Sequence, residues 1–129
     1  MGAWGLGVFD NDEAGDFLWE IDEGDDGRKI VGAMTKVLTT IGYLEAPEAV
    51  RGLAAAALVA AKREPGLFPS DSEEAATTAK LSTLPFYAPW LARMTISRIL
   101  SRSELAELWD EAGELEDWRD DARRYLKAL

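Results

Sequence analysis

The chain has 129 residues, of which 47% are hydrophobic, and a formal net charge of −10 at pH 7; this is typical of one folded domain, expected over residues 1–129. It contains no cysteine and no histidine. These absences exclude disulfides, thiolate nucleophiles, cysteine-bound zinc or iron–sulfur clusters and every catalytic arrangement that depends on imidazole.

The first predicted helix follows an irregular N-terminal segment rich in glycine and tryptophan. Asp10 is a suitable N-cap, since Asn11, Asp12 and Glu13 would then place polar and acidic side chains at the positive end of the helix dipole. The turn sequence at residues 24–27 should end the helix. Its buried stripe would consist of Phe17, Leu18 and Ile21.

Two further helices are predicted from apolar residues that recur at helical spacing. The second covers about residues 26–43, with a stripe that extends through Ile41 to Leu44. The third covers about residues 47–63, because Pro47 suits the first turn of a helix. Its many alanines predict a close approach to a neighbouring helix.

The fourth and fifth helices are separated by prolines. The fourth would begin at a cap formed by Ser70 or Asp71 and end near Leu84, since Pro85 disfavours helix in the residue before it. The fifth would cover residues 90–100. The linker between them is strongly aromatic, so we expect it either to fold beneath the core or to form the wall of a pocket.

Two last helices complete the prediction. Residues 101–104 fit the capping-box pattern, with Glu104 at its end. The inner faces of the two helices would present Leu105, Leu108, Trp109 and Ala112, and then Trp118, Ala122, Tyr125, Leu126 and Leu129. The predicted fold class is therefore all-α, a single compact bundle of five to seven helices.

Charge is unevenly distributed along the sequence. Residues 1–27 carry nine acids and no bases, residues 28–100 carry six acids and nine bases, and residues 101–129 carry nine acids and five bases. Acidic ends of this kind repel nucleic acid and attract a basic protein. The competing interpretation is that the acidity serves solubility alone.

Patterns for catalysis or metal binding are weak. Asp10, Asp12 and Gly15 match the first, third and sixth positions of an EF-hand loop, but Ala14 and Ile21 stand where two further ligands belong. Neighbouring carboxylates are common in a chain with 24 acids and specify no acid–base site. We therefore expect no catalytic residue, no metal ligand and no cofactor, and a protein that is not an enzyme.

We find no targeting signal in the sequence. No basic region followed by an apolar run begins the sequence. No apolar stretch reaches the roughly 18 residues that a membrane helix requires. We expect a soluble cytoplasmic protein that binds neither membrane nor nucleic acid.

Four segments together resemble one known family. They are the Trp-Gly-x-Gly-x-Phe-Asp-Asn-Asp motif at residues 4–12, residues 43–49, the apolar run at residues 53–61 and the Ser-Glu-Leu-x-Glu-Leu-Trp motif at residues 103–109. Over nearly its whole length the chain resembles domain-of-unknown-function family 4259, which consists of small bacterial proteins of about this size. The resemblance implies no activity, because none is established for that family.

Ten residues are candidates for a binding site. They are Trp4, Phe9, Asp10, Asn11, Asp12, Phe86, Tyr87, Trp90, Glu104 and Trp109. The leading hypothesis is a non-enzymatic interaction or inhibitor protein, comparable to small acidic immunity proteins, that engages a basic protein partner. It requires the acids at the two ends of the chain to remain unpaired on the exterior.

Two other hypotheses remain open. The first is a helical domain that binds a small molecule or a divalent metal, either as an enzyme or without catalysis. Its pocket would be walled by Phe86, Tyr87, Trp90 and Trp4, with Asp10, Asp12 or Glu104 as its polar group. The second is an assembly role through an apolar face; the sequence leaves the oligomeric state undetermined.

The motif residues also have a purely structural interpretation. Asp10, Asn11 and Asp12 can accept hydrogen bonds from the exposed N–H groups at a helix start, while Ser103 and Glu104 can cap another helix. Most of the five tryptophans are expected in the core. Trp4 is the exception, since among glycines and acids it would either pin the N-terminal segment or anchor a partner.

Overall fold

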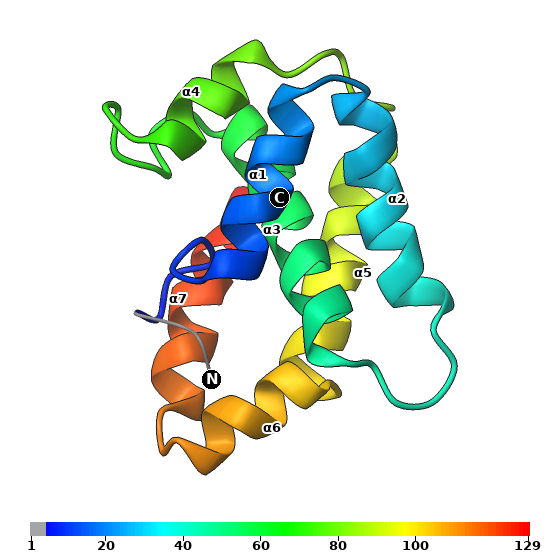
Figure 1. Cartoon of the computed structure of the whole chain (residues 1–129), viewed down its shortest axis with the longest axis vertical. Helices are drawn as coiled ribbons and strands as arrows, with labels where there is room; N and C mark the ends of the chain where they lie inside the picture. The colour runs from blue at the N-terminus through cyan, green and yellow to red at the C-terminus, as the bar shows by residue number, and fades with distance from the viewer. Residues whose placement is uncertain (1–4) are drawn as a thin grey trace.

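The computed structural model describes residues 5–129, and within them the chain forms seven α-helices and no β-strand (Figure 1). The helices are α1 (Asp12–Asp22), α2 (Asp26–Thr39), α3 (Ala46–Arg63), α4 (Glu73–Lys80), α5 (Ala88–Ser101), α6 (Glu104–Glu111) and α7 (Leu115–Ala128). The predicted all-α fold of five to seven helices is confirmed. Trp4 and the start of the predicted irregular segment lie outside the described residues.

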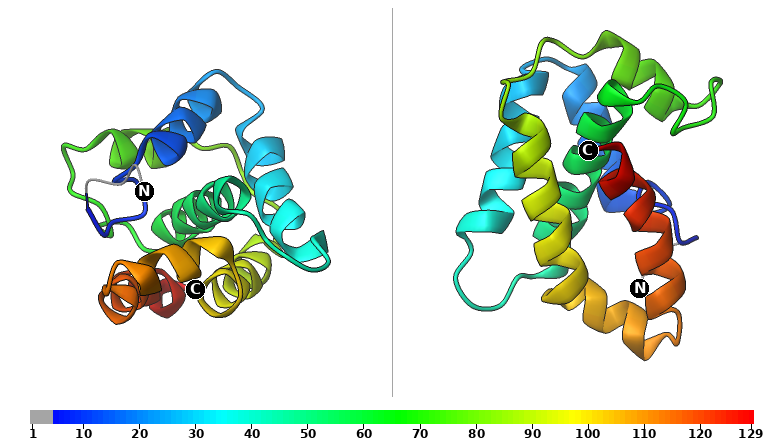
Figure 2. Two further views of the ribbon diagram at one scale, coloured as in Figure 1. Left: turned by 60° about the horizontal axis from the view of Figure 1, so that its bottom comes forward. Right: turned by 180° about the vertical axis from the view of Figure 1, so that it is seen from behind.

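Helix α3 lies at the centre of the molecule and contacts all six other helices (Figure 2). Every residue from 52 to 61 is buried. Because glycine and alanine side chains are small, the surrounding helices approach the α3 backbone closely. A Cβ atom added to Gly52 would overlap Val37 of α2 and would lie 3.5 Å from Ile99 of α5. The predicted close packing of the alanine-rich helix is therefore confirmed.

Helix α2 ends at Thr39, earlier than predicted. The hydroxyl groups of Thr39 and Thr40 donate hydrogen bonds to carbonyl oxygens of the preceding turn, at 2.8 and 2.6 Å, and so satisfy acceptors at the helix end. Gly42, with a φ of 89°, then turns the chain. The predicted stripe is wrong at Ile41, which is 99% exposed, and Leu44 is buried but lies outside the helix.

Helix α4 is shorter than predicted. Its N-cap is Ser72, whose Oγ accepts a hydrogen bond from the N–H of Ala75 at 3.1 Å, so the predicted caps at Ser70 and Asp71 are wrong. The helix ends at Lys80. The main-chain groups that follow bond to side chains of α2 and α3 instead of extending the helix.

The capping box predicted at residues 101–104 does not form, because Ser101 still belongs to α5. The N-cap of α6 is Ser103, whose Oγ accepts from the N–H of Ala106 at 3.0 Å and donates to the carbonyl of Ile99 at 2.7 Å. The predicted inner faces of the last two helices are buried at Leu105, Trp109, Trp118, Ala122, Tyr125 and Leu129. No helix within residues 5–129 has the length and apolar character needed to cross a membrane.

Candidate functional site

The N-terminal motif forms a tight loop around the carboxylate of Asp10. The N–H of Gly7 donates to Oδ2 of Asp10 at 3.0 Å, and the N–H of Asp10 donates to the carbonyl of Gly7 at 3.0 Å. A Cβ atom on Gly5 would lie 2.5 Å from this Oδ2, and one on Gly7 would lie 2.7 Å from it. Both positions therefore require glycine unless the carboxylate moves, which explains the spacing of the motif.

The N-cap of α1 is Asn11, one residue after the predicted position. Its Oδ1 accepts from the N–H of Ala14 at 2.8 Å, and its Nδ2 donates to the carbonyl of Val8 at 3.2 Å. An ionised aspartate could accept the first bond but could not donate the second. Val8 and Phe9 are buried, so the motif fastens the N-terminal loop to the core. The structural interpretation is thus confirmed for Asn11, whereas Asp10 accepts from an N–H of the loop and not of the helix start.

Two of the four family segments, residues 43–49 and 103–109, bond to each other where α3 and α6 begin. The N–H of Glu104 donates to the carbonyl of Leu44 at 2.8 Å, and Oε1 of Glu104 accepts from the N–H of Ala46 at 2.7 Å. The hydroxyl of Tyr43 donates to Oε2 of Glu107 at 2.6 Å, and this bond raises the pKa of Tyr43 to about 12. Glu104 therefore caps α3 and not its own helix.

A cavity of about 290 Å³ lies where the four family segments meet, at residues 4–12, 43–49, 53–61 and 103–109. Its walls come from the loop before α1 and from α1, α3, α6 and α7, and they are mostly apolar. They consist of Gly7, Val8, Asn11, Asp12, Glu13, Ala46, Pro47, Val50, Leu53, Leu105, Leu108, Trp109 and Trp118. Three of the predicted site residues, Asn11, Asp12 and Trp109, are thus brought together here.

The aromatic linker lies elsewhere, so the predicted pocket that joins it to the acidic motif is wrong. Phe86, Tyr87 and Trp90 are 95%, 42% and 58% exposed, and none of them lines the cavity beside Asp12. Prolines on both sides of the linker, together with the early end of α4, hold it at the surface. The linker is therefore not folded beneath the core; it does form a pocket wall, but at Pro85 and Tyr87 of a different groove, beside α2.

Arg51 of α3 forms ion pairs with two of the N-terminal carboxylates and offsets one of their two charges. Its Nη1 lies 3.2 Å from Oε1 of Glu13, and its Nη2 lies 2.5 Å from Oε2 of Glu20. Three further acids accept hydrogen bonds from main-chain N–H or hydroxyl groups, namely Asp10, Asp22 and Asp26. The requirement that all N-terminal acids remain unpaired is therefore wrong.

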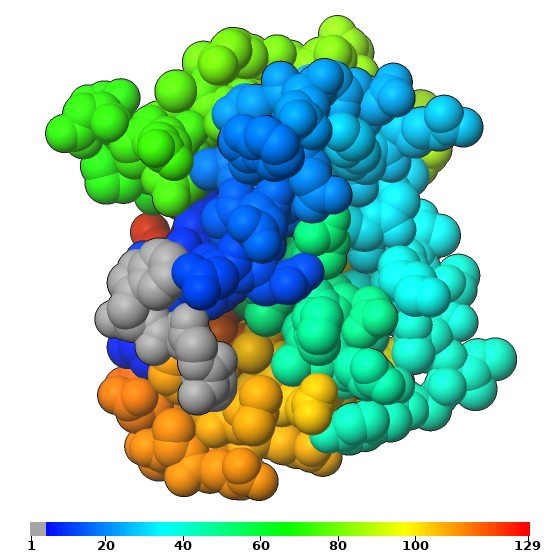
Figure 3. Space-filling view, in the orientation of Figure 1, coloured from blue at the N-terminus to red at the C-terminus, as the bar shows by residue number. Residues whose placement is uncertain are grey.

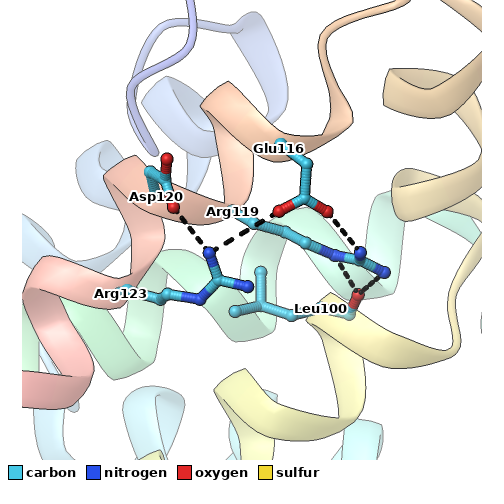
Figure 4. Close-up of polar contacts among 5 residues, drawn as sticks. All are labelled: Leu100, Glu116, Arg119, Asp120 and Arg123. Atoms are coloured by element: carbon cyan, nitrogen blue, oxygen red, sulfur yellow. Dashed lines mark hydrogen bonds and ion pairs between the residues drawn. The ribbon is translucent and has the colours of Figure 1, made fainter.

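Two acids of α7, Glu116 and Asp120, are also paired within the molecule (Figure 4). Nη1 of Arg119 lies 2.8 Å from Glu116, while Nε and Nη2 of the same side chain donate to the carbonyl of Leu100 at 3.1 and 2.9 Å. Nη1 of Arg123 lies 2.6 Å from Asp120. Arg119 therefore fastens α7 to the end of α5, and the ion pairs within α7 leave less negative charge available to a partner.

An acidic surface on α1 remains exposed to solvent. Asp12, Asp16, Trp19 and Glu23 lie on the side of α1 opposite its buried stripe, and we call this set the outer face of α1. Trp19 is 66% exposed, and the three carboxylates make no hydrogen bond or ion pair with any of residues 5–129. Figure 3 shows α1, in blue, running across the front of the molecule.

Sequence reasoning missed Trp19, because a tryptophan in a short amphipathic helix was expected in the core. A signal was nonetheless present. Positions 12, 16, 19 and 23 recur at helical spacing, and they lie opposite the stripe formed by Phe17, Leu18 and Ile21. The same periodicity that predicts the buried side therefore also predicts an exposed Trp19.

Metal binding gains no support from the geometry. Over residues 5–129, no group of three acidic side chains converges closely enough to hold a metal ion.

A second exposed group of acids lies around the turn between α6 and α7 and consists of Asp110, Glu111, Glu114 and Asp117. Unlike the outer face of α1, that turn contains no large exposed apolar side chain.

These features define an all-α protein built around the central helix α3. Its sequence motifs form the hydrogen bonds at the starts of α1, α3 and α6. Residues 2–121 match the model of a family described as a domain of unknown function (DUF4259), and the chain belongs to this family. The resemblance seen in the sequence is therefore confirmed. Searches of curated proteins and of solved structures found no match to the chain.

Proposed function

We propose that the protein is a non-enzymatic interaction module that binds a basic protein through the outer face of α1. The observation that carries this proposal is the exposed ring of Trp19 within a row of carboxylates from Asp12, Asp16 and Glu23. An inhibitory or immunity-like role is one form that such a module takes.

The chemistry of this face suits a cationic partner surface. Covering an exposed indole removes a large apolar area from water, and tryptophan is among the residues that dominate interface energies. Exposed carboxylates add little affinity each, but together they steer a basic protein toward the face. The proposal thus assigns affinity to Trp19 and orientation to the acids.

The outer face is also held in place before any partner binds. Arg51 bridges Glu13 and Glu20 on the flank of α1, and its guanidinium carbon lies 5.0 Å from the centre of the Phe17 ring. Asn11 caps the start of the helix. A prearranged face loses less conformational entropy on binding than a mobile one.

Zero-length carbodiimide cross-linking tests the proposal, because it joins carboxylates to lysine amines that touch them. In extracts of the producing cells, we expect cross-links from Asp16 and Glu23 to lysines of a basic protein. With that protein purified, the Trp19→Ala variant should bind it more than about tenfold more weakly. Asp16→Lys should also weaken binding, and added salt should weaken binding of the native protein.

Asp117→Lys provides the matched control, since Asp117 is an exposed acid on another helix. We expect it to bind the partner almost as tightly as the native protein does. Two results would contradict the proposal. One is an affinity that does not change with ionic strength, and the other is an equal loss of affinity in Asp16→Lys and Asp117→Lys.

The cavity supports a second candidate function, the binding of a small apolar molecule. Its volume of about 290 Å³ is close to the lower end of the range for ligand pockets, and its walls combine Leu53, Leu105 and Trp109 with a few polar groups. A thermal-shift screen of metabolites separates the two candidates. A rise of several degrees that Leu53→Trp abolishes would favour the cavity.

A further inference from the structure

Positive charge is concentrated on the part of the molecule built from α2 and α5. Residues 27–44 and 75–103 contain no carboxylate, so all 24 acids lie in the rest of the chain. The two segments contain seven basic residues: Arg28, Lys29, Lys36, Lys80, Arg93, Arg98 and Arg102. Helices α2 and α5 lie side by side (Figure 2, right), so the part of the surface that they form carries a net positive charge although the protein as a whole is acidic.

A groove runs along this surface between α2 and the linker that precedes α5. It has a volume of about 750 Å³. It is lined by Gly27, Arg28, Val31, Gly32, Thr35, Lys36, Thr39, Thr83, Pro85 and Tyr87. Gly32 is exposed, and a Cβ atom added to it would meet no atom within 4 Å, so the groove is accessible to a partner at this position.

Large apolar side chains are exposed beside the groove. Phe86, Tyr87, Trp90 and Met94 are 95%, 42%, 58% and 41% exposed. Tyr87, Trp90 and Met94 recur at helical spacing, so they follow one edge of α5. Phe86 packs against Tyr87 of the groove with ring centroids 5.6 Å apart, whereas Trp90 and Met94 line a second depression between α2 and α5. Several large apolar side chains exposed on neighbouring turns are typical of an interaction site.

Two cations at the groove are available to a partner. Arg98 donates to the carbonyls of Thr40 and Gly42, so its charge is used within the molecule. In contrast, the side chains of Arg28 and Lys36 make no hydrogen bond or ion pair with any of residues 5–129, and both line the groove.

We propose that this groove binds an acidic amphipathic helix of a partner protein. The small residues Gly27 and Gly32 allow the partner backbone to approach closely, and the exposed aromatic side chains cover the apolar side of the partner helix. Arg28 and Lys36 attract its carboxylates. The groove is shallow and follows α2 from Gly27 to Thr39, so it matches the side of a second helix laid along α2.

Titration with designed peptides tests this proposal on the full chain. The probe is a helical peptide of about five turns with leucines on one face and glutamates on the other, and in the control peptide lysines replace the glutamates. We expect the glutamate peptide to bind and the lysine peptide to bind at least about tenfold more weakly.

Two glycines offer matched variants. Gly32→Leu fills the groove, whereas Gly15→Leu places the same side chain on α1, where a Cβ atom also meets no atom within 4 Å. Both glycines lie inside helices, so leucine should not disrupt either fold. We expect Gly32→Leu to weaken binding of the glutamate peptide at least about tenfold and Lys36→Glu to weaken it several-fold, while Gly15→Leu leaves it unchanged.

Several results would overturn the proposal. They are absence of binding, equal binding of the two peptides, and equal effects of Gly32→Leu and Gly15→Leu. Self-association that Gly32→Leu abolishes would show a second copy of this chain in the groove. If the protein binds phosphatidylserine-containing vesicles more tightly than the glutamate peptide, the groove binds a membrane surface and not a helix.

Discussion

Glu104, in the first turn of α6, accepts a hydrogen bond from the main-chain N–H of Ala46 at 2.7 Å and thereby caps the central helix α3. The N-cap position of α3 is occupied by Glu45, whose own side chain makes no capping hydrogen bond. A residue more than fifty positions away in the sequence therefore satisfies a donor at the start of the most buried helix.

Removing this cap should destabilise the protein measurably. We expect Glu104→Ala to lower the free energy of unfolding by about 1–2 kcal/mol, because the N–H of Ala46 loses its acceptor. Glu104→Gln keeps an acceptor oxygen and should lose less. Urea denaturation measures both, with Glu111→Ala as an exposed control on the same helix. Equal stability of Glu104→Ala and the control would show that the bond contributes nothing.

The N-terminal loop predicts a coupling between two motif residues. Gly7→Ala should destabilise the fold by about 1–3 kcal/mol, since its Cβ atom would lie 2.7 Å from Oδ2 of Asp10. In the Asp10→Ala background the same change should cost less, because the carboxylate is absent. A double-mutant cycle followed by thermal unfolding reports this coupling. Gly15→Ala, at an open helix position, should instead stabilise the protein by roughly 0.5–1 kcal/mol.

The contact between α2 and α3 predicts a second coupling, in the core. A Cβ atom on Gly52 would overlap Cγ2 of Val37, so Gly52→Ala should destabilise the fold by about 1–3 kcal/mol even though alanine favours helix. Combining it with Val37→Ala should restore part of the loss by removing the methyl group that clashes. If the double variant shows only the sum of the two single losses, the closest approach of the helices lies elsewhere.

The bond between Tyr43 and Glu107 predicts a dependence on alkaline pH. Because the pKa of Tyr43 is raised from 10.0 to about 12 in the folded protein, the stabilising effect of the bond is complete below pH 10 and is lost as the pH rises toward 12. Spectrophotometric titration should show that Glu107→Gln lowers the pKa of this phenol. Between pH 10 and 12, stability should decline less steeply in Tyr43→Phe than in the native protein.

Helix content could be predicted from the sequence because it depends on local periodicity. The stripe of Phe17, Leu18 and Ile21 recurs at helical spacing, and the structure confirms it. Helix α3 is also confirmed, although it is buried continuously over residues 52–61 and not along a single stripe. Helix ends were predicted less well. They depend on which side chain reaches a free N–H or carbonyl, and at Asn11 and Ser103 a neighbouring cap was equally plausible from sequence.

The candidate site could be predicted only in part. Asn11, Asp12 and Trp109 meet at one cavity, because the loop before α1 packs beside α6. Phe86 and Trp90 appeared suited to the same pocket by residue type, yet the fold places them on another face. Residue type predicts a preference for apolar contact, but only tertiary packing decides which contact is made.

The sequence by itself determined the helical fold, the family and the excess of negative charge, since these follow from residue order and composition. The tertiary structure decided which acids are neutralised, because charge pairing depends on distances in space. Arg51 removes Glu13 and Glu20 from the acidic surface, while Asp16 and Glu23 beside Trp19 have no such neighbour within residues 5–129. Coulomb attraction between charges separated along the chain acts only after folding brings them within a few ångströms.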